Sequence, residues 1–143
     1  MTSVAIIDDV KSNRQILGKI IETIDPNIAI HDFNRAEQAL DWANNQTPDL
    51  VITDYKLPGL DGIGFVERFR SNPKLREIPV LMMTIADDLL LPTRAYVAGV
   101  TAFLQRPVDH DLTRARISSL LPSRRSRIRL QLVVDNSQPY SPT

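Results

Sequence analysis

Three aspartates follow directly on short apolar runs in the first half of the chain. Residues 4–7 (VAII) precede Asp8 and Asp9, and residues 50–53 (LVIT) precede Asp54. Continuous β-branched runs of this kind are typical of buried strands in parallel sheets, and the carboxyl ends of such strands share one edge of the sheet. Reactive groups of open α/β sheets lie just beyond that edge. We therefore expect the three carboxylates to meet in one crevice.

Three neighbouring carboxylates need a physical reason, because like charges a few ångströms apart raise one another's pKa and burying an isolated charge is costly. A bound divalent cation removes the conflict, and carboxylate and carbonyl oxygens are ligands that Mg²⁺ prefers. Such an ion would neutralise an incoming phosphoryl group, and an aspartate can accept phosphate covalently. Taken singly, Asp8 and Asp9 also fit a helix N-terminal pair, and Asp54 a cap or turn residue. The combination at strand ends favours a functional site.

Alternating strands and helices are needed to bring these aspartates together. Hydrophobic periodicity predicts strands over residues 4–7, 28–33, 50–53, 79–84 and 100–105, and helices over residues 13–24, 35–45, 61–71, 87–99 and 109–121. This alternation predicts an α/β fold: a doubly wound, flavodoxin-like parallel sheet of five strands in the order 2-1-3-4-5, with helices on both faces. Ser12 or Asn13 is a candidate cap of the first helix. Pro92 is expected to shorten the fourth helix by leaving residues 87–91 as loop.

Length and composition limit the class of protein. The chain has 143 residues, of which 43% are hydrophobic and 24% charged, as is ordinary for a soluble globular domain. Lys+Arg and Asp+Glu both number 17, so bulk charge attracts the chain to neither nucleic acid nor membrane, and neither is expected as a partner. There is no cysteine, which excludes a disulfide scaffold or thiolate metal site and fits a reducing cytoplasm. No signal peptide or membrane span is indicated, and we expect a cytoplasmic protein.

The end of the chain differs in composition from the rest. We expect one domain over residues 1–121 and a basic and apolar C-terminal tail or linker over residues 122–143. Four arginines gather near the start of this tail: Arg124, Arg125, Arg127 and Arg129. The apolar residues among and after them either dock as a strand-like segment or extend the last helix toward an output domain. Residues 135–143 are expected to be disordered.

Several spaced motifs together resemble the receiver domain of bacterial two-component response regulators, of the chemotaxis-regulator type. The matching segments are IIDD at 6–9, DYKLPGLDG at 54–62, IPVLMMT at 78–84, AGVTAFL at 98–104 and RPVD at 106–109. They occur in the family's order and at its spacing, and the resemblance covers about residues 1–121. Agreement of several spaced motifs is far more specific than any one of them.

The resemblance implies a phosphoacceptor and a metal site. Asp54 would take a phosphoryl group from the histidine of a sensor kinase. Mg²⁺ would be held by Asp54, by Asp9 directly and by Asp8 partly through water, and the backbone carbonyl of Lys56 would complete the protein ligands.

Four further residues take roles by the same resemblance. Thr84 would hydrogen-bond the phosphoryl oxygen and move toward it on activation, and Phe103 stands where the family keeps its rotating aromatic. Arg106 occupies the place of a lysine that bridges the acceptor carboxylate and the phosphoryl group, and Pro107 should follow a cis peptide bond. Judged by residue type alone, Thr84 also fits an ordinary strand residue and Phe103 a core aromatic.

Two residues depart from the family pattern. Arg106 replaces a nearly invariant Lys, and its planar guanidinium is larger and differently hydrated than an ammonium group. Ile85, directly after Thr84, stands where the family usually has a small residue that leaves the phosphoryl pocket open. We expect slower phosphotransfer, slower dephosphorylation or both. Loss of phosphorylation is the less favoured outcome, because the three aspartates and Thr84 are present.

The resemblance implies a signalling receiver that is at most a slow self-dephosphorylating phosphoacceptor and not a conventional enzyme. Its partners would be a sensor histidine kinase or a phosphotransfer protein. The family often uses the fourth helix, fifth strand and fifth helix for homodimers and partner docking. Two alternatives stay open. One is a phosphorylation-independent pseudo-receiver that serves as a dimerisation or docking module. The other is the N-terminal regulatory domain of a larger cyclic-dinucleotide enzyme.

Overall fold

Five parallel strands form the central sheet of the computed structural model, which describes residues 1–85, 90–107 and 109–122. The strands are β1 (Ser3–Ile7), β2 (Ala29–Phe33), β3 (Leu50–Asp54), β4 (Val80–Thr84) and β5 (Ala102–Gln105). Their order across the sheet is β2-β1-β3-β4-β5, and each neighbouring pair runs parallel. The flavodoxin-like α/β fold predicted from the sequence is therefore confirmed.

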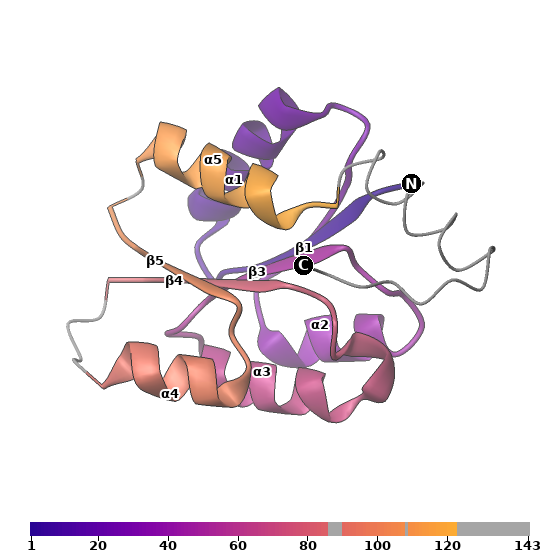
Figure 1. Ribbon diagram of the computed structural model, residues 1–143, viewed down its shortest axis with the longest axis vertical. Coiled ribbons are helices and arrows are strands. Elements are labelled where there is room, and N and C mark those ends of the chain that lie inside the picture. Colours follow the sequence, from indigo (N-terminus) through magenta and orange to yellow (C-terminus); the bar gives the residue numbers. More distant parts are fainter. Residues whose placement is uncertain (86–89, 108, 123–143) are drawn as a thin grey trace, which may run out of the picture.

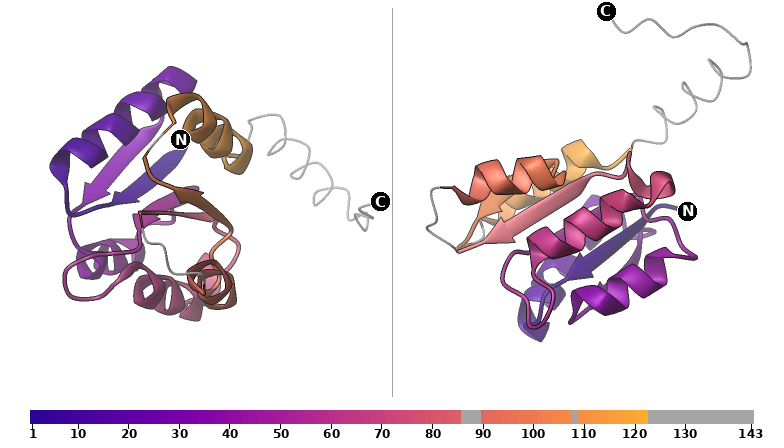
Figure 2. Two further views of the ribbon diagram at one scale, coloured as in Figure 1. Left: turned by 90° about the vertical axis from the view of Figure 1, so that its left-hand side faces the viewer. Right: turned by 90° about the horizontal axis from the view of Figure 1, so that it is seen from below.

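Helices cover both faces of this sheet (Figures 1 and 2). One face carries α1 (Lys11–Ile24) and α5 (His110–Leu120), and the other carries α2 (Ala36–Ala43), α3 (Gly62–Ser71) and α4 (Leu91–Ala98). A short 3₁₀ helix, Pro73–Leu75, follows α3. Within the described part of the chain, none of the helices is long and apolar enough to cross a bilayer.

The strands alternate their side chains between two cores because successive residues of a strand point to opposite faces. Along β3, Leu50 and Ile52 join the core beneath α1 and α5, whereas Val51 joins the core beneath α2, α3 and α4. In that second core the rings of Phe65 and Phe69 stack with centroids 5.3 Å apart. Burial on both faces explains the continuous apolar runs in the sequence.

Aspartate side chains order the starts of α3 and α1. Asp61 caps α3 by accepting a hydrogen bond from the amide of Gly64 at 2.8 Å. The cap predicted for α1 is wrong: the helix begins at Lys11, and Val10 stands at the cap position without a side-chain bond. Asp8 orders this turn instead, because its Oδ1 accepts the amide of Val10 at 2.9 Å.

The fourth helix is short, as Pro92 led us to expect. It begins at Leu91 and places Pro92 in its first turn. A proline is tolerated there because first-turn amides have no partner within the helix. Of the loop predicted over residues 87–91, residues 87–89 lie outside the described part of the chain, as does the tail from residue 123 onward.

Strand register sets the level at which the acidic residues emerge. In the pairing of β1 with β3, Ile6 lies opposite Ile52 and Ile7 opposite Thr53. Asp8 follows Ile7 along the chain, and Asp54 follows Thr53. The central strands therefore deliver both carboxyl groups to the same edge of the sheet.

Candidate functional site

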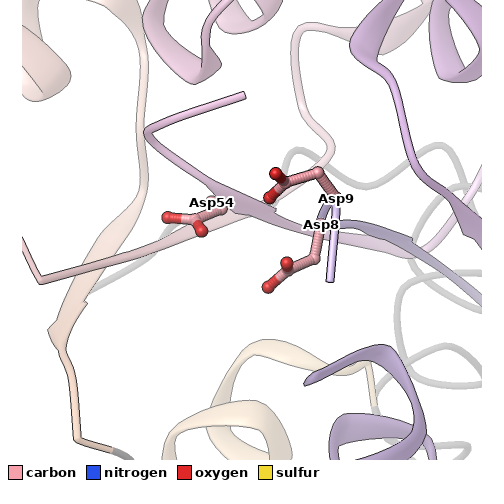
Figure 3. A group of neighbouring side chains, drawn as sticks. All are labelled: Asp8, Asp9 and Asp54. Carbon is pink, nitrogen blue, oxygen red and sulfur yellow. The ribbon is translucent and has the colours of Figure 1, made fainter. Parts of the chain in front are cut away.

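The three aspartates form one cluster at the carboxyl ends of β1 and β3 (Figure 3). One carboxylate oxygen from each of Asp8, Asp9 and Asp54 lies within 4.8 Å of the others. Asp8 is buried, Asp54 is partly buried and Asp9 is exposed. The cluster is thus closed on the Asp8 side and open to solvent on the Asp9 side.

Asp8 is held by bonds to both its backbone and its side chain. Its carboxylate accepts the Val10 amide on Oδ1 at 2.9 Å and Nη2 of Arg106 on Oδ2 at 2.6 Å. Its backbone carbonyl accepts Nη1 of Arg14 at 2.7 Å, and Nε of Arg14 in turn contacts Oδ2 of Asp32 at 3.0 Å. Arg14 therefore ties the end of β1 to β2, and the sequence pattern did not single it out.

Asp54 sits in an environment that opposes its ionisation. Burial raises the pKa of the Asp54 carboxyl, and the charges of Asp8 and Asp9 raise it further. The charge of Arg106 and the amide of Tyr55, which donates to Oδ1 at 2.8 Å, act in the opposite direction on this pKa. The upward direction prevails, so added positive charge would stabilise the ionised cluster.

The donor set fits a hard divalent cation. Carboxylate oxygens converge from two strands, and oxygens of this kind are the ligands that Mg²⁺ takes with its remaining waters. Lys56, whose carbonyl is the fourth predicted ligand, lies in the loop directly after β3. Mg²⁺ bound here would supply positive charge at the point where carboxylates repel one another.

The loop after Asp54 is fixed by contacts that the sequence pattern did not reveal. Oε1 of Glu37, from α2, accepts the amide of Leu60 at 2.9 Å. The amide of Gly62 donates to the carbonyl of Tyr55 at 2.8 Å. A Cβ atom at Gly62 would lie 2.3 Å from the carbonyl oxygen of Asp54, so only glycine allows this approach. These contacts fix the loop that contains Lys56 to α2 and to the end of β3.

The remaining predicted residues lie on β4, β5 and the turn after β5. Thr84 is the buried last residue of β4, and its carbonyl accepts the amide of Arg106 at 2.8 Å. Phe103 is partly buried, pairs with Met82 in strand register and packs against the core beneath α2, α3 and α4. The peptide bond between Arg106 and Pro107 is cis, which is the conformation that the resemblance implies.

A pocket of about 490 Å³ opens beside the cluster. Its lining includes Asp54, Arg106, Pro107 and Ile85, with further residues from α1 and the start of α5. Ile85 is 66% exposed, so it lies at the mouth of the pocket rather than filling it. Of the three aspartates in the cluster, Asp54 is the one that lines this pocket.

Comparison with known proteins agrees with this geometry. The family model described as the response regulator receiver domain matches residues 4–118. The chain is 38% identical over 122 residues to the cyclic di-GMP phosphodiesterase response regulator RpfG of Xanthomonas campestris pv. campestris strain 8004, an alignment that covers 85% of this chain and 32% of RpfG. It is 27% identical over 134 residues to the response regulator PleD of Caulobacter vibrioides strain NA1000, covering 92% of this chain and 27% of PleD.

A solved structure of similar fold is that of the chemotaxis response regulator CheY4 of Vibrio cholerae. It superposes with a TM-score of 0.77 at 23% identity, over 85% of this chain and 99% of CheY4. The chain thus spans about a third or less of RpfG and PleD but nearly the whole of CheY4. The chain belongs to the response regulator receiver domain family of two-component systems.

Proposed function

We propose that Asp54 is the phosphoacceptor of this receiver domain and takes a phosphoryl group from the histidine of a sensor kinase or a phosphotransfer protein. The observation that carries the proposal is the meeting of Asp54 with Asp8 and Asp9, one oxygen of each lying within 4.8 Å of the others. Asp54 also lines the adjoining pocket, which gives a donor a route to it. Proteins of this family interact with histidine kinases or phosphotransfer proteins.

The transfer is a displacement at phosphorus. A carboxylate oxygen of Asp54 forms the new P–O bond while the P–N bond to the donor imidazole breaks, and the electron pair of that bond stays on the imidazole nitrogen. Little other covalent chemistry is required, so positioning and charge stabilisation make up most of the catalysis. Mg²⁺ held by Asp8, Asp9, Asp54 and the carbonyl of Lys56 would supply charge stabilisation. Arg106, which lines the same pocket, adds a second positive group.

The effect of phosphorylation is proposed to be transmitted through Thr84 and Phe103. Thr84 lies at the end of β4, one residue beyond Met83, which pairs with Asp54 in strand register. A phosphoryl group on Asp54 would give the Thr84 hydroxyl a new acceptor, and a shift of this residue would alter the packing around the partly buried Phe103. Such a local change can bias a two-state surface.

The proposed output surface comprises α4, β5 and α5. On α4, Val97 is 85% exposed and Tyr96 is also exposed, so apolar area is available for a partner or a second copy. We propose that phosphorylation changes partner binding or dimerisation at this surface. We also infer a cytoplasmic location, which the absence of cysteine supports.

Acetyl phosphate with Mg²⁺ tests the proposal on wild type, Asp54→Ala and Asp41→Ala, with intact-protein mass spectrometry as the readout. Asp41 is exposed on α2 and serves as a matched control. We expect one phosphoryl adduct on wild type and Asp41→Ala, none on Asp54→Ala, and none after EDTA treatment. No adduct on wild type, together with no response to beryllofluoride and Mg²⁺, would instead identify a pseudo-receiver.

A second candidate function is regulation of a larger cyclic-dinucleotide enzyme. It is favoured by the 38% identity to RpfG, a protein described as a cyclic di-GMP phosphodiesterase, of which this chain covers 32%. In this arrangement residues 1–121 form the receiver and residues 122–143 the linker that follows α5. The reading frame of the gene distinguishes the two cases, since an enzyme domain encoded in frame after residue 143 is required for the second.

A further inference from the structure

Arg14 joins the ends of two strands through a single guanidinium group. Its Nη1 donates to the backbone carbonyl of Asp8 at 2.7 Å, and its Nε donates to Oδ2 of Asp32 at 3.0 Å. Arg14 lies near the start of α1, and helical side chains point back toward the helix start, which brings the guanidinium to the end of β1. The Arg14 side chain is only 15% exposed. Its two contacts therefore fix the guanidinium in one place at the edge of the sheet.

The carbonyl that Arg14 holds belongs to the peptide group between Asp8 and Asp9. A peptide group is planar, so a bond that fixes the direction of this carbonyl also fixes the direction in which the chain continues to Asp9. On the other side of the Asp8 Cα, the amide of Asp8 donates to the carbonyl of Phe33 at 3.0 Å. The backbone of Asp8 is thus bonded on both sides, once by β2 and once by Arg14.

Asp9 depends on this backbone more than Asp8 does. The Asp8 side chain is buried and has its own bond from the amide of Val10, whereas Asp9 is exposed and gains little orientation from packing. The two side chains leave the chain in different directions (Figure 3), yet an oxygen of Asp9 lies within 4.8 Å of oxygens of Asp8 and Asp54. The place of Asp9 in the cluster therefore depends on the peptide group that Arg14 holds.

The charge of Arg14 would act against a cation in the cluster. A guanidinium next to the backbone of Asp8 and a divalent ion among the carboxylates carry charges of the same sign, which repel each other. Charge alone thus predicts that removing Arg14 tightens the binding of Mg²⁺. The geometry predicts the opposite, because removing Arg14 releases the peptide group that directs Asp9. The two effects differ in sign, so one measurement separates them.

We propose that Arg14 is a positioning residue of the metal site, which holds the peptide between Asp8 and Asp9 so that the exposed Asp9 carboxylate stays directed toward the other two aspartates. This inference rests on the proposed function, because the ion that Asp9 would bind is part of that proposal. Asp32 contributes indirectly, since it anchors the guanidinium from β2. Loss of contacts that orient metal ligands typically weakens metal binding by about ten- to a hundredfold.

Isothermal titration with Mg²⁺ at fixed ionic strength tests the proposal on the full chain as wild type, Arg14→Met and Arg14→Gln. Lys19→Met is the matched control, since it removes the same charge from an exposed position of the same helix. We expect both neutral variants at position 14 to bind Mg²⁺ roughly tenfold more weakly than wild type, at the lower end of the usual range. Lys19→Met should bind as wild type does. Circular dichroism verifies folding, and the Gln variant decides the matter if the Met variant does not fold.

A second readout follows the peptide group itself. The carbonyl carbon resonance of Asp8 reports on the bond from Arg14 and should shift in both variants before any ion is added. The shift of the Asp9 amide on addition of Mg²⁺ should then require a higher ion concentration than in wild type.

The outcomes separate this inference from the metal site. Unchanged or tighter Mg²⁺ binding in the folded variants at position 14, with normal binding in wild type, would overturn the positioning role while leaving the metal site intact. Lower stability in urea without weaker Mg²⁺ binding would likewise assign Arg14 a purely structural role. Absence of Mg²⁺ binding in wild type and in every variant would overturn both this inference and the metal site proposed above.

Discussion

The surroundings of Asp54 in the acidic cluster disfavour the ionisation of its carboxyl group. Its pKa is raised first by burial and then by Asp8 and Asp9, and this rise outweighs the effect of Arg106. A carboxyl group whose pKa is higher in the folded than in the unfolded state binds its proton more tightly when folded. Its ionisation therefore destabilises the fold, and the penalty grows as the pH rises from the ordinary value of 3.8 through the raised value.

Asp54→Asn should accordingly stabilise the protein at neutral pH in the absence of divalent ions. We expect a melting temperature a few degrees higher, which for a domain of this size is about 1 kcal/mol. The gain should shrink as the pH falls toward 3.8, where wild-type Asp54 is protonated as well. Differential scanning calorimetry between pH 3.8 and neutral pH measures this gain in melting temperature, with Asp41→Asn as the control. An Asn variant no more stable than wild type at neutral pH would contradict the cause assigned to the pKa shift.

We expect Ile85 to affect entry to the pocket rather than the chemistry at Asp54. Its side chain is 66% exposed at the mouth of the space that Asp54 lines. Ile85→Ala should speed both labelling by acetyl phosphate and loss of the label, each by up to about tenfold, which corresponds to ~1.4 kcal/mol of barrier. Adduct mass followed over time gives both rates. Rates equal to those of wild type would show that the pocket mouth does not limit access.

At the scale of elements, the approach of α3 to the end of β3 depends on Gly62. A Cβ at this position would meet the carbonyl oxygen of Asp54 at 2.3 Å, whereas a Cβ at Gly18, inside α1, would meet only Cδ1 of Ile30 at an ordinary 3.9 Å. Gly18 lies inside α1, where alanine is the better helix former, whereas Gly62 is the first residue of α3. The two glycines differ in the space that each leaves for a Cβ atom.

We expect opposite results from alanine at these two positions. Gly18→Ala should stabilise the protein by about 0.5–1 kcal/mol, and Gly62→Ala should destabilise it by roughly 2 kcal/mol or more because backbone atoms must shift. Urea denaturation of the two variants provides the comparison. Equal stabilisation by both substitutions would mean that α3 can move away from β3 at little cost.

Glu37 links α2 to the loop after β3. The amide of Leu60, which donates to Oε1 at 2.9 Å, is the main cause that lowers the pKa of the Glu37 carboxyl. A group with a lowered folded pKa stabilises the protein above its ordinary pKa, here 4.5, and loses that contribution as the pH falls through the lowered value. The hydrogen bond between Glu37 and Leu60 should therefore stabilise the protein most at neutral pH.

Glu37→Gln tests the contribution of this hydrogen bond to stability. We expect it to lower the urea midpoint at neutral pH, because an amide accepts the Leu60 bond less strongly than a carboxylate does. The difference from wild type should narrow at pH values below 4.5. Glu22→Gln, at an exposed position of α1, is the control. A deficit that does not change with pH would assign the effect to packing and not to charge.

For the whole molecule, the sequence was sufficient to predict the order of the strands and the meeting of the three aspartates. The apolar runs are buried on both faces and end at one edge of the sheet, so their period and their last residues placed Asp8 and Asp54 without coordinates. Proline chemistry also predicted a late start of α4; the expected loop extended to residue 91, and the helix begins at Leu91 itself. Each of these features depends on a local sequence pattern and not on contacts between segments far apart in the sequence.

The contacts that refine the site could not be read from such patterns. Arg106 and Asp8 are 98 residues apart in sequence, and Glu37 reaches a backbone amide 23 residues away. Neither pairing leaves a periodic signal, because each depends on how separate loops meet in three dimensions. The cap of α1 failed because the helix begins earlier than its apolar pattern, at Lys11, so Ser12 and Asn13 lie within its first turn and Asp8 bonds the amide of Val10 before it.

The central claim is that the whole fold serves to make Asp54 the single acceptor of a phosphoryl group. Peptide mapping after acetyl phosphate treatment with Mg²⁺ and borohydride reduction tests it most directly, since reduction converts an aspartyl phosphate into homoserine. The account predicts homoserine at position 54 alone, and none when EDTA is present. Homoserine at another aspartate, or at none while beryllofluoride also leaves the protein unchanged, would contradict it.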